Sequence, residues 1–152
     1  MKIYLPNHDI IMDLHDAIIE VSGGRPGVLH DEVIDAAIHR PKTYLAYQDD
    51  CSLHTVCAVL LDSIARNHAF VEGNKRTGLM TALLTYELND VALTMQADQT
   101  DDFENLVLWV VEDKPPIEEI TSKLEYLVGK YQKGKVSKFV DKIKGLIEPF
   151  EG

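Results

Sequence analysis

The chain has 152 residues, 45% of them hydrophobic, which is enough apolar material for one core and too little for two domains. Its 25 acidic and 15 basic residues give a net charge of −10, which argues against a general affinity for nucleic acid or for an anionic membrane. No apolar run approaches the length of a membrane span, and the polar residues 6–9 interrupt the N-terminus before a signal sequence could form. We therefore expect a soluble cytoplasmic protein.

The first predicted helix follows Asn7, a residue type that is favoured at the N-cap. Apolar residues then recur at helical spacing as far as Val21, and the pair Gly23-Gly24 ends the helix. His8 and His15 are seven residues apart and could share a helix face. Because no third metal ligand follows at a suitable spacing, we place both histidines at the surface.

A second helix is predicted from Asp31, as its N-cap, to His39, with Pro41 as the residue that stops it. Residues 42–50 contain two tyrosines and allow two interpretations. They either form an extended segment, or they are a plain connection whose aromatic side chains pack on the core.

Two long apolar helices are predicted in the middle of the chain, from Leu53 to Asn67 and from Lys75 to Leu88. Both are apolar on most faces, which is typical of helices at the centre of a core. The short polar stretch between them cannot form a core of its own, so we expect the helices to hold it rigid, with Phe70 as its core anchor. The two cysteines, six residues apart, would lie on different helix faces as unbridged thiols.

This polar stretch runs into the start of a helix and has the features of an anion site. Gly73 permits a positive φ, after which the first turn would present unpaired backbone amides. These amides belong to Asn74, Lys75 and Arg76. Two cations at a helix N-terminus oppose the helix dipole unless an anion lies between them, so the pattern indicates a negatively charged ligand.

Two further side chains of the stretch add catalytic chemistry. Glu72 offers the hard oxygen ligand that Mg²⁺ prefers when the ion bridges phosphates. His68 is the nearest imidazole, and it can accept a proton from a hydroxyl nucleophile near neutral pH. Together with the anion site, these residues predict transfer of a group from a nucleotide to a hydroxyl.

The remainder of the chain also reads as helical. A short strand is predicted over residues 91–95, then a helix capped by Thr100 or Asp98, and then a helix from residue 115 to Tyr131. Residues 130–152 carry six lysines and three acids, with apolar residues at spacings of three and four. We expect this segment to be a basic amphipathic helix packed on the body of residues 1–129. A role in an oligomer, in a groove that binds a partner protein or at a membrane surface stays open.

From His68 to Thr77 the sequence resembles the Fic/Doc family, whose motif reads His-x-Phe-x-Asp/Glu-Gly-Asn-Gly/Lys-Arg. Eight of these ten positions carry the residue typical of Doc-like members. The Gly-Gly-Arg-Pro-Gly turn at residues 23–27 and the pair Arg40-Pro41 are similar to the family as well. The resemblance implies a mainly α, single-domain helical bundle with room for a short β flap or hairpin.

What the resemblance implies about activity depends on two positions in particular. Lys75 and Leu79 stand where the AMP-transferring members carry glycine and a second arginine, and both departures favour the Doc-like branch. A similar threonine-to-glutamate pattern at residues 100–105 is discounted as an inhibitory motif, because its partner arginine is absent at Leu79.

The implied function is that of a toxin of a toxin-antitoxin pair. The resemblance implies that this toxin is a protein kinase. With Mg²⁺ bound, it would transfer the γ-phosphate of ATP to a Ser or Thr hydroxyl of a translation factor such as elongation factor Tu. His68 would be the base, Glu72 the metal ligand, and Gly73 with the three following residues the nucleotide site. Because Gly73 is retained, AMP transfer is the first alternative to phosphate transfer. A non-catalytic nucleotide-binding module is the second alternative. The oligomeric state is not determined by the sequence.

Overall fold

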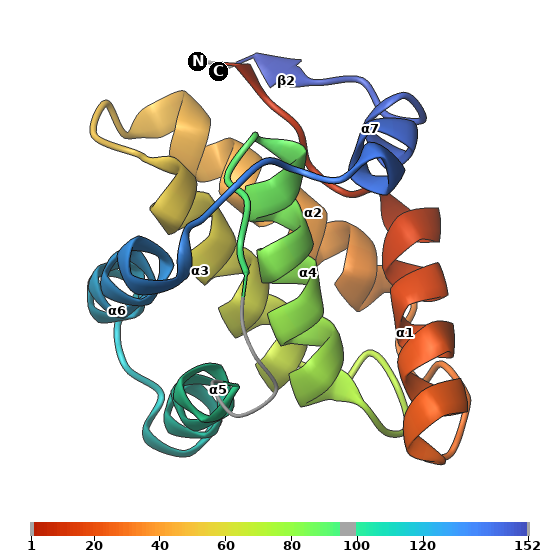
Figure 1. Cartoon of the computed structure of the whole chain (residues 1–152). Coiled ribbons are helices and arrows are strands. Elements are labelled where there is room, and N and C mark those ends of the chain that lie inside the picture. The colour runs from red at the N-terminus through yellow and green to blue at the C-terminus, as the bar shows by residue number, and fades with distance from the viewer. Residues whose placement is uncertain (1, 95–99, 152) are drawn as a thin grey trace.

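The computed structural model describes residues 2–94 and 100–151, and this part of the chain is mainly helical, as expected (Figure 1). In chain order its elements are β1 (Lys2–Ile3), α1 (His8–Ser22), α2 (Glu32–Tyr47), α3 (Leu53–Arg66), α4 (Asn74–Leu88), α5 (Asp101–Asp113), α6 (Ile117–Tyr131), α7 (Lys138–Lys144) and β2 (Phe150–Glu151). The N-cap of α1 is Asn7, whose side chain accepts from the Ile10 amide, and Gly23 ends this helix in the left-handed conformation. No helix in the described part of the chain is long and apolar enough to cross a membrane.

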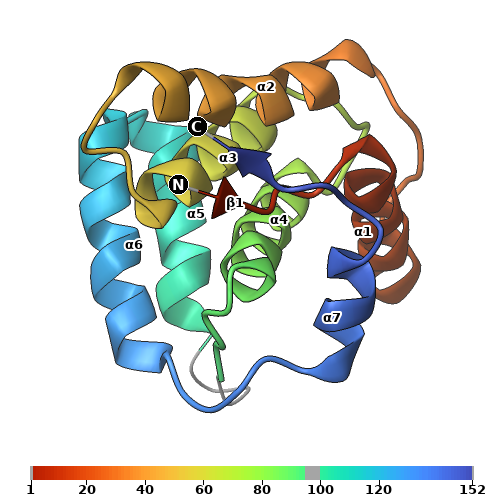
Figure 2. The same cartoon turned by 90° about the horizontal axis from the view of Figure 1, so that it is seen from above.

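Helix α3 is the central element, surrounded by α2, α4, α5 and α6 (Figure 2). Every residue from position 56 to position 65 is buried, which explains why its sequence is apolar on most faces. Helices α3 and α4 approach closely at Gly78, where an added Cβ would lie 3.0 Å from the backbone nitrogen of Ala65. The predicted pair of central helices is therefore confirmed, and the loop between them is held at both ends by the core.

Helix α2 is longer than predicted, because it continues through Pro41 to Tyr47. The prediction that Pro41 stops it is wrong, and residues 42–47 are helical, neither extended nor a plain connection. The predicted packing of the aromatic side chains on the core holds for Tyr44 but not for Tyr47, which is 84% exposed. Pro41 is buried, and beyond it Tyr44 and Leu45 pack against the core. This burial offsets the one helical hydrogen bond that proline cannot donate. The predicted N-cap Asp31 forms no side-chain cap, since its carboxylate is bonded to His8 instead.

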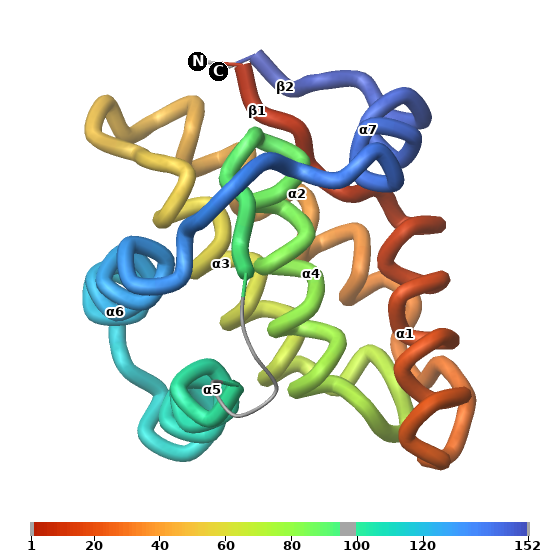
Figure 3. Tube along the Cα trace, in the orientation of Figure 1, coloured from red at the N-terminus to blue at the C-terminus, as the bar shows by residue number. Residues whose placement is uncertain are grey.

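The C-terminal segment is less helical than the amphipathic pattern predicted. The only helix within residues 132–151 is α7, which packs against α4, while Phe139 and Leu146 are 68% and 73% exposed. Gly134, with φ of 81°, lies in the connection that separates α7 from α6. The chain then returns to the N-terminus, where β2 pairs antiparallel with β1 (Figure 3). A single long helix over residues 130–152 is thus wrong, and the division at residue 129 stays a prediction.

The connection between α4 and α5 is described only in part. Leu93 forms an isolated antiparallel bridge with Gln132, so residues 91–94 do not form the predicted strand. Met95 and the candidate cap Asp98 lie outside the described residues, whereas Thr100 occupies the N-cap position of α5.

Candidate functional site

The predicted anion turn is present at the start of α4. Gly73 is its N-cap, with φ of 83° and ψ of 14° in the left-handed region that glycine enters without strain. Three amides of the first turn, those of residues 74–76, have no hydrogen-bond partner among the described residues. The Lys75 and Arg76 side chains are exposed beside them. The geometry therefore supplies the donors and charges that an anionic phosphate needs.

The Asn74 side chain serves the loop itself. Its Oδ1 accepts from the Phe70 amide at 3.0 Å, and its Nδ2 donates to the Phe70 carbonyl at 2.9 Å. This pair of bonds closes the turn between residues 70 and 74 and fixes the direction in which α4 begins. Phe70 is 0% exposed and anchors the loop in the core, as the sequence predicted. The Asn74 side chain therefore has a structural role in the loop, while its backbone amide has no partner among the described residues and can contact a ligand.

A buried histidine that the sequence analysis assigned to the surface lies beneath the turn. His15 of α1 is 1% exposed, and its ring stacks on Phe70 with 3.7 Å between centroids and an interplanar angle of 6°. Its Nε2 donates to the Glu72 carbonyl oxygen at 2.7 Å. The prediction of a surface position is wrong, because the ring packs on Phe70 and donates its hydrogen bond inside the protein. The four-residue spacing of Ile11, His15 and Ile19, all buried, is the signal that could have shown this.

Glu72 forms an ion pair with Arg25, which lies in the turn after α1. The Arg25 amide donates to Oε2 and its Nε donates to Oε1, both at 2.9 Å. The backbone N–H of Arg25, followed by its guanidinium, lowers the pKa of the Glu72 carboxyl, so the group is ionised at neutral pH. No group of three metal-ligating side chains in the described chain includes Glu72. A Mg²⁺ ion held there would take its other ligands from phosphate and water, as this ion commonly does.

The strand-like segment beside the site is not the one that the sequence suggested. Val28 forms an antiparallel bridge with Phe70, and the Val71 amide donates to the Gly27 carbonyl. Residues 27–30 thus run along the loop with main-chain hydrogen bonds, and Leu29 is 55% exposed. An extended segment does border the loop, but it precedes α2 rather than following it.

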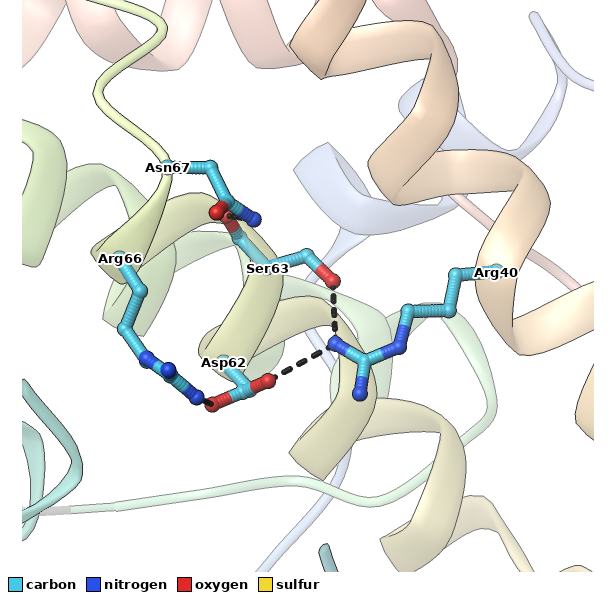
Figure 4. Close-up of polar contacts among 5 residues, drawn as sticks. All are labelled: Arg40, Asp62, Ser63, Arg66 and Asn67. Atoms are coloured by element: carbon cyan, nitrogen blue, oxygen red, sulfur yellow. Dashed lines mark hydrogen bonds and ion pairs between the residues drawn. The ribbon is translucent and has the colours of Figure 1, made fainter. Parts of the chain in front are cut away.

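His68 is exposed and has a positive φ of 49°, which is uncommon for a residue with a side chain. The end of α3 just before it is fixed by a buried carboxylate (Figure 4). Asp62, with its side chain 6% exposed, accepts from Arg40 of α2 at 2.8 Å and from Arg66 at 2.9 Å. Asn67, the C-cap residue, donates to the Ser63 carbonyl at 2.8 Å. This network holds in place the helix end from which His68 projects.

Arg76 lies at the border of an apolar groove of about 540 Å³ between α1, α4 and α5. Val21, which is 90% exposed, and Met80, which is 42% exposed, line this groove. Glu104, the acid of the discounted inhibitory pattern, lines it as well. The ion pairs found among the described residues do not include one between Arg76 and Glu104.

Comparison with known proteins agrees with this geometry. A sequence model described as the Fic/DOC family matches residues 5–86, which is more than half of the chain. The chain belongs to the Fic/DOC family. The matched Fic/DOC region contains α1 to α3, the complete loop and most of α4, so it includes every candidate site residue.

Two curated Fic/DOC relatives are similar over this region. Protein kinase doc of Escherichia phage P1 is 40% identical over 81 residues, which is 53% of this chain and 64% of the relative. Toxin Doc of Mycolicibacterium smegmatis is 38% identical over 88 residues, or 56% of this chain and 68% of the relative. The chain therefore spans a little less than two thirds of the phage protein.

Proposed function

We propose that this protein is a Doc-like kinase that transfers the γ-phosphate of ATP to a Ser or Thr hydroxyl of another protein. The observation that carries the proposal is the loop itself. One short segment joins an exposed imidazole, an ionised carboxylate and a turn of unpaired amides beside two cations. The similarity to a relative named protein kinase doc supports phosphate transfer in particular.

Each residue has a role that follows from its position. His68 accepts the proton of the acceptor hydroxyl as its oxygen bonds to the γ-phosphorus, while the bond from that phosphorus to the β-γ bridging oxygen breaks and ADP leaves. The amides of residues 74–76, with Lys75 and Arg76, stabilise the charge on the phosphoryl oxygens. Glu72 would hold Mg²⁺, which when bound neutralises phosphate charge. Gly73 allows the backbone to turn close to the phosphates.

The proposal extends to the partners of the enzyme. The acceptor would be a translation factor such as elongation factor Tu, and phosphorylation in the cytoplasm would arrest translation. The segment at residues 27–30 supports target recognition, because a partner strand could extend its main-chain pairing beside His68. The apolar groove beside Arg76 supports binding of a small antitoxin protein, since exposed apolar surfaces of this kind mark protein interfaces.

AMP transfer is the second candidate function, and Gly73 is the residue that favours it. Gly73 keeps the glycine of the family motif in the left-handed conformation, and a Cβ at this position would lie 3.2 Å from Ile19 Cδ1 and 3.4 Å from His15 Cδ2. The opposing observation is Lys75, whose side chain adds volume and charge beside the same turn.

The test uses ATP labelled at either the γ or the α phosphate, incubated with the protein, Mg²⁺ and purified elongation factor Tu. We expect label on the acceptor from the γ position alone, and loss of transfer in His68→Ala. His39→Ala, which removes an exposed histidine of α2, is the matched control and should transfer normally. Label from the α position alone would replace the kinase with AMP transfer. If nucleotide binds and neither label is transferred to elongation factor Tu or to lysate proteins, the protein is a binding module.

A further inference from the structure

Among the described residues, Glu72 forms an ion pair with Arg25 alone. The two groups belong to segments 47 residues apart, and they meet because residues 27–30 are bonded along the loop. The guanidinium covers Oε1 and the Arg25 amide covers Oε2. The carboxylate that we propose as the metal ligand is therefore already neutralised by a residue of the same chain.

The backbone and the side chain of Arg25 are held to different degrees. The backbone is fixed, because the next turn is tied to the loop by the Val71–Gly27 hydrogen bond. The chain also passes close to Glu72 at Gly24, where a Cβ would lie 2.9 Å from Glu72 Oε2 and 3.0 Å from Ile19 Cδ1. The Arg25 side chain, in contrast, is 76% exposed, so water can hydrate its guanidinium when the ion pair is broken. The side chain can therefore leave while the backbone amide stays bonded to Oε2.

A divalent cation and the guanidinium compete for the same oxygen. Both are positive, so they repel each other at the short separation that a shared carboxylate imposes. We infer that Arg25 is a resident counter-ion of Glu72, which a divalent cation must displace from Oε1, so that Arg25 sets the cation affinity of the site. The inference rests on the proposed function only in taking Glu72 as the metal ligand. It makes Arg25 a residue that determines how much metal the enzyme needs.

The experiment measures binding of Mn²⁺ alone to the whole protein, without nucleotide. Paramagnetic broadening of the backbone amide signals of residues 72–73 reports this site specifically. Site resolution matters, because His8, Asp31 and Asp35 form a separate exposed group that could also attract the ion. The full amide spectrum shows in the same samples that each variant is folded.

We expect Arg25→Ala to bind Mn²⁺ about two- to fivefold more tightly at residues 72–73, the gain that loss of one exposed ion pair allows. Lys135→Ala removes the same charge at an exposed position, so it should change the affinity much less. Glu72→Gln should abolish the local broadening. An unchanged affinity in Arg25→Ala, together with loss of broadening in Glu72→Gln, overturns the role of Arg25 and leaves the proposed function standing. Broadening that persists in Glu72→Gln overturns both.

Discussion

Replacing Asn74 with alanine separates a structural role from a ligand-binding role at the centre of the family motif. The Asn74 side chain makes two hydrogen bonds to the Phe70 backbone, at 3.0 and 2.9 Å, in a part-buried position. A typical intramolecular hydrogen bond contributes about 0.5–1.5 kcal/mol net, so losing both should lower the free energy of unfolding by about 1–3 kcal/mol. The turn at Gly73 should also loosen.

The assay is urea unfolding of Asn74→Ala and of a matched control, Asn67→Ala. The control loses one hydrogen bond at an exposed helix end, so a loss of about 1 kcal/mol or less is expected. Nucleotide binding is measured on the same samples in buffer. An unfolding free energy within about 0.5 kcal/mol of wild type, combined with a tenfold loss of nucleotide affinity, would refute the reasoning. It would mean that the Asn74 side chain contacts the ligand.

Three further predictions concern the supports of the loop. Asp62→Asn removes the shared counter-ion of two arginines that are about one third exposed, and should lower the free energy of unfolding in urea by about 2–3 kcal/mol. The hydrogen bond to Asp31 raises the pKa of His8, so this pair stabilises the fold below the ordinary histidine pKa and loses that effect as pH rises through the raised value. The stability difference between wild type and His8→Asn should therefore shrink as the pH rises above the ordinary histidine pKa of about 6.5, and a constant difference would contradict the sign. His15→Phe keeps the stacked ring but leaves the Glu72 carbonyl unpaired, so it should cost about 1–3 kcal/mol and speed hydrogen exchange at the turn; unchanged exchange would contradict this.

Local patterns predicted those parts of the site that depend on neighbouring residues. The left-handed Gly73, the free amides after it and the anchoring of Phe70 all follow from a polar loop that meets a helix between two apolar segments. Contacts between distant segments were not predictable in this way. Nothing near Arg25 in the chain indicates that it pairs with Glu72, because the partner is 47 residues away.

The sequence by itself determined the helical class, the central pair of helices and the position of the candidate loop between them, because helical periodicity, capping and the loop motif act over a few residues. Only the tertiary structure decided what surrounds these residues. It buried His15 beneath the turn, carried α2 through Pro41 to Tyr47, and used the Asn74 side chain to hold the loop. The reason is physical: burial against a distant element can outweigh a local preference such as the stop at proline. The placement of a polar side chain likewise depends on which groups the fold brings within hydrogen-bonding distance.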